Sequence, residues 1–209
     1  MVEHDLSAIV VCGGKSTRMG VDKAFLRLNG ETFLSRIVSE LKTITNQVFI
    51  TVGSKRPESY LREAGGPVRI VGYTLEFGSP LSGLVAAVDF IETPYFALVG
   101  CDMPLVKAEL IGYLYSACLG HSAAVPRWDA SGVLEPLCAV YHTPSVRLGL
   151  RSVLDEGKYR LIDLIATLLD VVYVPTSRLA SIDPNLNSLK NVNTPQEYAL
   201  LLNSECSQR

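Results

Sequence analysis

The chain has 209 residues, a formal net charge of −2 at pH 7 and a hydrophobic fraction of 48 %. This length suits one α/β domain with a substantial core, and we expect residues 1–209 to form a single domain. No apolar run approaches the roughly 20 residues that span a bilayer, and the small net charge argues against nucleic acid as a partner.

Strand-like and helix-like segments alternate through the first half of the chain. The run at 7–12 predicts a strand, and an Asn-Gly turn within 25–33 indicates a small hairpin. Apolar residues recur at helical spacing from 33 to 44. Further strands are expected over 48–52, 68–71 and 95–100, with helices over 57–64 and 81–91 between them.

The second half is less regular. A helix is expected over 107–119, and residues 122–126 and 135–141 are predicted to be strands joined through a turn at 129–132. Thr194, Pro195 and Glu197 are typical of a helix start with a capping box. The element order predicts an α/β fold of three layers, in which a mostly parallel sheet has helices on both faces and an antiparallel addition in the second half.

Five cysteines occur without C-x-x-C spacing, which indicates neither a disulfide framework nor a zinc site. Cys12, Cys101 and Cys138 lie in apolar runs, where a free thiol acts as a small hydrophobe. The acidic start of the chain has no secretory character. We therefore expect a reduced, cytoplasmic setting without a membrane partner.

A glycine-rich segment follows the first strand. Gly13 and Gly14 can adopt backbone angles that other residues avoid, which would let consecutive N–H groups converge on an anion. Arg18 offers a planar fork for phosphate oxygens, and Lys23 offers a compact charge. A Gly-Gly pair taken alone is more often a plain turn, and the spacing matches neither the dinucleotide fingerprint nor the P-loop. The whole segment nevertheless indicates a polyphosphate site that binds a nucleotide.

Asp102 directly follows a predicted buried strand, with Pro104 two residues on. Like the glycine-rich segment, it comes at the carboxyl end of a strand, where ligands bind in parallel α/β sheets. Mg²⁺ commonly binds one or two protein carboxylates together with phosphate oxygens. Asp102 is therefore a candidate magnesium ligand, although an aspartate here would also suit a helix cap.

The string Gly-Gly-x-Ser-x-Arg-Met-Gly-x-Asp-Lys at 13–23 resembles the signature loop of the molybdenum cofactor guanylyltransferases, which are nucleotidyltransferases of the glycosyltransferase-A-like fold. The resemblance covers nearly the whole chain and is strongest over 8–30, 79–104 and 187–198. It implies that GMP passes from GTP to the terminal phosphate of molybdopterin, with Mg²⁺ as cofactor and pyrophosphate as the second product. It also suggests molybdoenzymes or other cofactor-assembly proteins as partners.

The resemblance implies roles for individual residues. The catalytic residues would be Arg18, Lys23 and Asp102, with Asp102 as the metal ligand. Gly83, Asn191 and Asn193 are candidates for substrate contacts. The nucleotide half would span about 1–105 and the acceptor half about 106–209. The nucleotide-binding residues would be Val11, Cys12, Gly13, Gly14, Ser16, Lys23, Thr51, Gly72 and Asp102.

Two departures concern recognition of the base. Relatives often carry asparagine at the position of Thr51 and aspartate at the position of Gly72-Tyr73. Because this chain lacks both side chains, guanine would be recognised mainly by hydrogen bonds to backbone groups of residues 11–13. Cytidylyl transfer to molybdopterin and nucleotidyl transfer to a sugar or polyol phosphate stay open as alternative reactions. A catalytically weak accessory protein that binds the nucleotide or the cofactor is the alternative of a different class.

Overall fold

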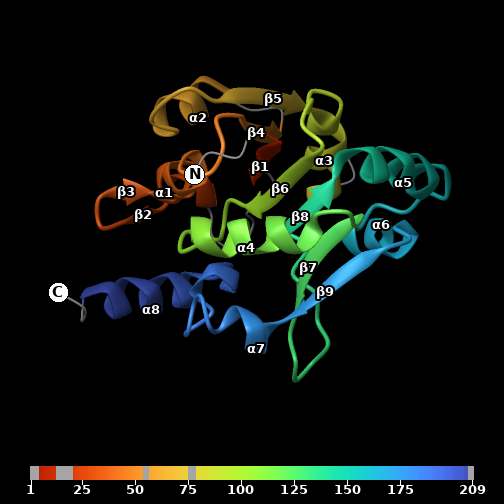
Figure 1. The fold of residues 1–209 in the computed structure, drawn as a ribbon. Helices are drawn as coiled ribbons and strands as arrows, with labels where there is room; N and C mark the ends of the chain where they lie inside the picture. The colour runs from red at the N-terminus through yellow and green to blue at the C-terminus, as the bar shows by residue number, and fades with distance from the viewer. Residues whose placement is uncertain (1–4, 13–20, 54–56, 75–78, 207–209) are drawn as a thin grey trace.

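The computed structural model describes residues 5–12, 21–53, 57–74 and 79–206. A seven-stranded sheet has the order β5-β4-β1-β6-β8-β7-β9, and a two-stranded hairpin of β2 and β3 lies outside it (Figure 1). The strands are β1 (Leu6–Cys12), β2 (Arg27–Leu28), β3 (Glu31–Thr32), β4 (Val48–Gly53), β5 (Arg69–Tyr73), β6 (Tyr95–Gly100), β7 (Ala123–Arg127), β8 (Cys138–His142) and β9 (Val171–Pro175). The helices are α1 (Phe33–Lys42), α2 (Pro57–Glu63), α3 (Pro80–Val88), α4 (Ala108–Cys118), α5 (Thr143–Asp155), α6 (Leu161–Thr167), α7 (Thr176–Leu179) and α8 (Pro195–Cys206), with the short 3-10 helices η1 (Lys23–Phe25) and η2 (Asn187–Leu189).

The pairing directions divide the sheet into two parts. Strands β5, β4, β1 and β6 are parallel, whereas β8 runs antiparallel to both β6 and β7. Strand β9 pairs in parallel with β7. The predicted α/β fold with an antiparallel addition is therefore confirmed. Because β7 and β9 run in the same direction as β1 and β6, the carboxyl ends of all four strands lie at one edge of the sheet.

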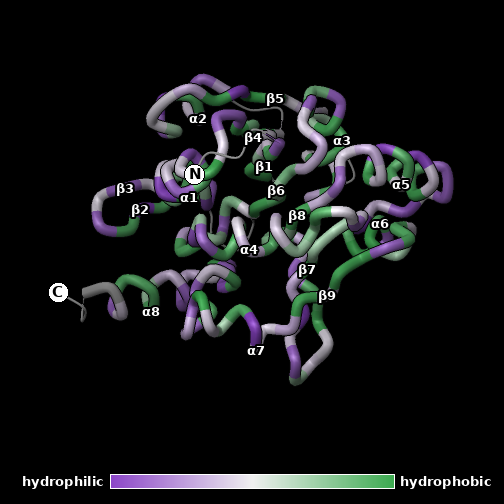
Figure 2. Tube along the Cα trace, viewed as in Figure 1, coloured by the Kyte–Doolittle hydropathy of each residue, from purple (hydrophilic) through white to green (hydrophobic). Residues whose placement is uncertain are grey.

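Strand β1 is buried along its whole length and contributes to two hydrophobic cores. Val10 and Cys12 belong to the core that α1 and α4 cover, whereas Ile9 and Val11 belong to the core that α3 and α5 cover. This division follows from the two-residue period of a strand. Figure 2 shows β1 and β6 coloured as hydrophobic segments. The predicted three-layer arrangement is confirmed.

The hairpin of β2 and β3 forms at the predicted Asn-Gly turn. Asn29 and Gly30 have φ angles of 54° and 88°, the positive values that a tight two-residue hairpin turn requires. The hairpin leads directly into α1, where the Thr32 hydroxyl accepts a hydrogen bond from the N–H of Ser35 at 3.1 Å. This cap fixes the start of α1 at the predicted Phe33.

The second half contains elements that the sequence analysis does not predict, namely α5, α6, α7 and β9. Strand β8 begins at Cys138 rather than at 135, because the N–H of Cys138 turns back to the carbonyl of Glu135 at 3.2 Å. The predicted start of α8 is confirmed, with Glu197 accepting from the N–H of Thr194 at 3.0 Å. Among the described residues, no helix has the length and apolar character needed to cross a membrane.

Candidate active site

Strands β1 and β6 are neighbours, so the residues at their carboxyl ends meet. Val11 pairs with Gly100, and the N–H of Cys101 donates to the carbonyl of Val11 at 3.1 Å. The chain turns directly afterwards, where the N–H of Met103 donates to the carbonyl of Gly100 at 3.2 Å. This turn holds Asp102 at the carboxyl edge of the sheet, which is where the sequence analysis places it.

Gly100 leaves room for the Asp102 carboxylate to fold back over the end of β6. A Cβ atom at position 100 would lie 2.6 Å from Asp102 Oδ1, closer than real Cβ contacts come. A side chain at this position would therefore displace the carboxylate. Gly100 is thus explained by the close approach of Asp102, not by backbone conformation alone.

Lys23 begins η1 and reaches Asp102 with its side chain. Asp22 caps η1 by accepting from the N–H of Ala24 at 3.0 Å, and the hydroxyl of Tyr60 in α2 donates to the same carboxylate. From this fixed start, Lys23 places its Nζ 3.0 Å from Asp102 Oδ2. The side chains of Lys23 and Asp102 are 16 % and 19 % exposed, so the pair is largely shielded from bulk water.

Asn193 contacts the same ammonium group. Its Oδ1 accepts from Lys23 Nζ at 2.5 Å. The backbone beside it is tied to the site, because the N–H of Val192 donates to the carbonyl of Asp102 at 2.9 Å. Glu197 accepts from the N–H of Asn193 at 2.6 Å, and this hydrogen bond lowers the pKa of Glu197. Lys23, Asp102 and Asn193, from three distant parts of the chain, form one cluster.

A second carboxylate lies at the same edge of the sheet. The indole Nε1 of Trp128, just after β7, donates to Glu135 Oε1 at 2.7 Å. Burial raises the pKa of Glu135, the Trp128 indole and the Asn191 side chain oppose the rise, and the negative charge of Asp102 adds to it. The predicted substrate residue Asn191 thus lies in a polar cluster next to that of Lys23.

Burial raises the pKa of the Cys12 thiol well above its ordinary value, and the neighbouring Cys101 thiol adds to the rise, so Cys12 stays neutral. The side chains of Val11 and Cys12 are buried in the two cores. The nucleotide contacts predicted for these two residues would therefore come from their backbone groups.

Thr51 and Gly83 pack against each other between β4 and α3. Thr51 is fully buried, and a Cβ atom at position 83 would collide with its hydroxyl. Within the described ranges this hydroxyl has no hydrogen-bond partner. Gly72 is an exposed residue of β5 that pairs with Val52. The packing explains Gly83 structurally, and the ligand contacts of Thr51, Gly72 and Gly83 stay predictions.

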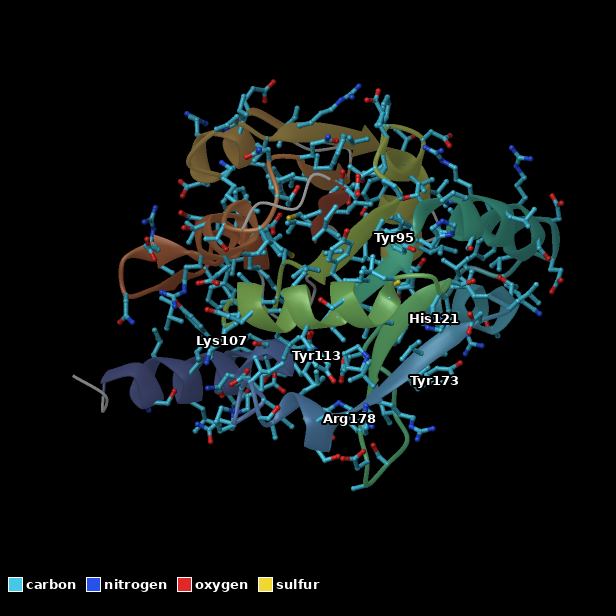
Figure 3. The ribbon with its side chains drawn as sticks, in the orientation of Figure 1. Tyr95, Lys107, Tyr113, His121, Tyr173 and Arg178 are labelled. Carbon is cyan, nitrogen blue, oxygen red and sulfur yellow. The ribbon has the colours of Figure 1, made fainter. Side chains whose placement is uncertain are left out.

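Gly13, Gly14, Ser16 and Arg18 lie outside the described residues, and their contacts with phosphate likewise stay predictions. His121 does not belong to the candidate site. It lies before β7, pairs with Asp170 at 2.8 Å, and is therefore at the opposite edge of the sheet (Figure 3).

The donor atoms of the cluster suit Mg²⁺. Asp102 offers carboxylate oxygens and Asn193 an amide oxygen, which are hard ligands of the kind that Mg²⁺ prefers. In the part of the chain that the structure describes, no group of three His, Cys, Asp or Glu side chains is placed to hold a metal ion. A magnesium site here would combine the Asp102 carboxylate with phosphate and water oxygens, which is the usual arrangement around this ion.

Tyr60 and Trp128 contact residues of the site but are not predicted from the sequence to do so. Tyr60 is 38 residues from Asp22, and nothing in the short segment around it signals the pairing. The sequence does contain a signal for the Trp128 contact, because Trp128 is the one tryptophan of the chain and stands next to a polar turn. An indole N–H in such a place needs an acceptor.

Comparisons with known proteins identify the family of the chain. The model of the MobA-like NTP transferase domain family matches residues 8–171. A probable molybdenum cofactor guanylyltransferase of Methanosarcina acetivorans is 30 % identical over 204 residues, which are 95 % of this chain and 90 % of the relative. One of Pyrococcus horikoshii is 35 % identical over 178 residues, 83 % of this chain and 88 % of the relative.

Solved structures show the same fold. Molybdopterin-guanine dinucleotide biosynthesis protein A from Archaeoglobus fulgidus superposes with a TM-score of 0.79 at 22 % identity, covering 97 % of this chain and 100 % of that one. A nucleotidyl transferase from Methanothermobacter superposes with a TM-score of 0.73 at 18 % identity, covering 99 % and 100 %. The family match, which spans most of the chain, decides the assignment: the chain belongs to the MobA-like NTP transferase family and is a nucleotidyltransferase.

Proposed function

We propose that this nucleotidyltransferase acts in molybdenum cofactor biosynthesis and transfers GMP from GTP to the terminal phosphate of molybdopterin. The observation that carries the proposal is the cluster of Lys23, Asp102 and Asn193 at the carboxyl ends of β1 and β6. It lies where the predicted phosphate loop leaves β1. The names of the curated relatives point to the guanylyl reaction.

For this reaction the protein mainly has to position the two substrates and stabilise negative charge. An oxygen of the acceptor phosphate bonds to the α-phosphorus of GTP, while the bond from that phosphorus to the bridging oxygen of pyrophosphate breaks. No nucleophilic side chain takes part. Negative charge accumulates on the departing pyrophosphate, and the fixed cation of Lys23, with that of Arg18, would stabilise it.

Asp102 would hold Mg²⁺, which stabilises charge on the phosphate oxygens and orients them when it is bound. In the described structure the Asp102 carboxylate and the Asn193 amide oxygen hold the Lys23 ammonium. A lysine side chain is otherwise long and mobile, so these two acceptors reduce the ordering that substrate binding must supply.

The division of the chain into a nucleotide half, about 1–105, and an acceptor half, about 106–209, belongs to the same proposal. Lys23 and Asp102 come from the first half, and Asn191 and Asn193 from the second. As further parts of the proposal, the enzyme works in the cytoplasm and delivers its product to molybdoenzymes or other cofactor-assembly proteins.

Purified protein offered GTP, CTP, ATP and UTP in turn, with molybdopterin and Mg²⁺, tests the function. We expect the dinucleotide cofactor and pyrophosphate to form from GTP. A preference for CTP would show that the enzyme is a cytidylyltransferase. Transfer only to sugar or polyol phosphates would show that molybdopterin is not the acceptor. Nucleotide binding without pyrophosphate release would indicate an accessory protein.

A further inference from the structure

Lys23 lies in a helix that is too short to hold its own position. The three residues of η1 form a single turn, in which the N–H of Phe25 donates to the carbonyl of Asp22 at 3.1 Å. The N–H of Leu26 donates to the carbonyl of Lys23 at the same distance. One helical turn is unstable alone, because few hydrogen bonds compensate for ordering its backbone. Contacts from other parts of the chain must therefore fix η1 and, with it, the Lys23 side chain.

The side chains of η1 point in different directions, because a 3-10 helix has about three residues per turn. Ala24 is fully buried in the core that α1 and α4 cover, and Phe25 packs against the same core. Lys23 extends instead to Asp102, with its Nζ 3.0 Å from Oδ2. The orientation of this one turn therefore decides where the ammonium group lies.

Tyr60, in α2, contacts both ends of this turn. Its hydroxyl donates to Oδ2 of Asp22, whose Oδ1 accepts from the N–H of Ala24 at 3.0 Å and so caps η1. Its ring lies against that of Phe25, with the ring centroids 4.8 Å apart and the planes at 50°. Tyr60 thus holds the residue before η1 by a hydrogen bond and the last residue of η1 by an aromatic contact.

Tyr60 is placed to act as an anchor. Among the described residues of α2 it is the only buried one, with 6 % of its surface exposed. Burial and, next, the hydrogen bond with Asp22 raise the pKa of its phenol well above the ordinary value, so the hydroxyl stays protonated and remains a donor. Removing this hydroxyl would release one oxygen of the Asp22 carboxylate while the ring stays in place.

We propose that Tyr60 is a positioning residue for nucleotidyl transfer, which holds η1 through Asp22 and Phe25 and thereby directs Lys23 toward Asp102. The inference rests on the proposed function, in which Lys23 acts on the triphosphate. In this role Tyr60 contacts neither substrate nor metal, and it acts through Lys23 alone. The loss of its hydroxyl should therefore reproduce part of the loss caused by Lys23→Ala.

The kinetic test measures Tyr60→Phe in the assay with GTP, molybdopterin and Mg²⁺. A misplacement of about 1 Å in a reaction site costs up to about 10²-fold, so we expect this variant to lower kcat/KM for GTP by about ten-fold. The KM for molybdopterin should not change, because Lys23 acts on the triphosphate. Normal kinetics with GTP, or a loss that appears only in the KM for molybdopterin, would contradict the proposal.

Tyr95→Phe is the matched control. It also keeps a ring and removes a hydroxyl that forms a hydrogen bond, in this case accepting from the N–H of Gly120 at 2.9 Å. Tyr95 begins β6, whereas Asp102 follows the other end of that strand. We expect Tyr95→Phe to show wild-type kinetics, and a loss equal to that of Tyr60→Phe would contradict a specific role of Tyr60.

A double variant separates positioning from general destabilisation. If Tyr60 acts only through the ammonium group, Tyr60→Phe should add little to the loss caused by Lys23→Ala, because residues that act as one unit are not additive. A purely structural role of the hydroxyl would lower the activity of both backgrounds equally. Full additivity of the two losses would therefore overturn the proposal.

Amide hydrogen exchange at Ala24 gives a readout that does not depend on activity, because this N–H donates to the Asp22 carboxylate. We expect faster exchange in Tyr60→Phe and wild-type exchange in Tyr95→Phe. Unchanged exchange in Tyr60→Phe would overturn the hold on η1, even if the wild type is active. Faster exchange in a protein whose wild type makes no product would instead overturn the proposed function and support the hold of Tyr60 on η1.

Discussion

The ammonium group of Lys23 lies 3.0 Å from the Asp102 carboxylate, although 79 residues separate the two in the chain. The contact exists because β1 and β6 are adjacent parallel strands, so that the segments after them emerge at one edge. Asp102 would hold the metal ion and Lys23 would bind the phosphates, and the fold places the two side chains next to each other. Displacement at phosphorus depends on such placement more than on reactive side chains.

Lys23→Ala should raise the KM for GTP and also lower kcat, because the charge serves both the bound triphosphate and the leaving group. Removing one charge-stabilising donor typically costs about 10²-fold in rate, and we expect a loss in kcat/KM of that size. Steady-state kinetics would measure it, with Lys158→Ala as a control, since Lys158 is paired with Glu156. A change in thermal stability alone, with normal kinetics, would make Lys23 a structural residue.

Gly100→Ala should lower magnesium-dependent turnover with little change in fold. The added Cβ would lie 2.6 Å from Asp102 Oδ1 but 3.5 Å from Leu137 Cβ, so the carboxylate must shift while the core need not. Gly112→Ala is the matched control, because nothing lies within 4 Å of its Cβ position. Equal kcat in the two variants would show that the close approach at Gly100 does not matter for the reaction.

Much of the fold could be predicted because local signals agreed with the tertiary structure. The apolar run of β1, the Asn29-Gly30 turn and the Thr194 cap each have a local physical cause. In contrast, α5 begins at Thr143 directly after β8 ends at His142, so no loop separates strand from helix, although Pro144 in the first turn is a usable signal of a helix start. Strand β9 is a largely half-buried edge strand without clear alternation, so it lacks the pattern of a buried strand.

The same distinction applies to the candidate site. Asp102 and Lys23 could be predicted because each stands next to the end of a predicted strand. The contact of Asn193 with Lys23 spans 170 residues and depends on how the segment before α8 returns to the sheet. No local pattern encodes this contact.

GTP should be preferred over ATP, but with a small margin over ITP. Thr51 is buried under α3 and Gly72 has no side chain, so the N2 amine of guanine lacks a side-chain acceptor from these positions. A good side-chain pair with a base edge is worth about 1–3 kcal/mol. Gly72→Asp, at a position with open space around its Cβ, should widen the margin. Strong rejection of ITP by the wild type in a competition assay would contradict this expectation and would mean that an acidic group from another position binds the N2 amine.

Glu197 should stabilise the protein in a pH-dependent way. The N–H groups of Asn193 and Thr194 lower its pKa in the folded state, so its contribution is present above the ordinary glutamate pKa of about 4.3 and is lost as the pH falls through the lower folded value. Thermal unfolding should show the wild type more stable than Glu197→Gln at neutral pH. The difference should shrink below about pH 4. A difference that is constant with pH would contradict a charge effect.

The most direct test of the central claim is magnesium-dependent formation of the dinucleotide cofactor from GTP by the wild type and by Asp102→Asn. Asparagine keeps the shape of the side chain and an acceptor for Lys23, and removes the charge that would hold the metal. We expect the variant to fold normally, with an unfolding temperature close to that of the wild type, and to lose most of its turnover, by about 10²-fold or more. Near-normal magnesium-dependent turnover in a folded Asp102→Asn variant would contradict the claim and assign the metal to another residue.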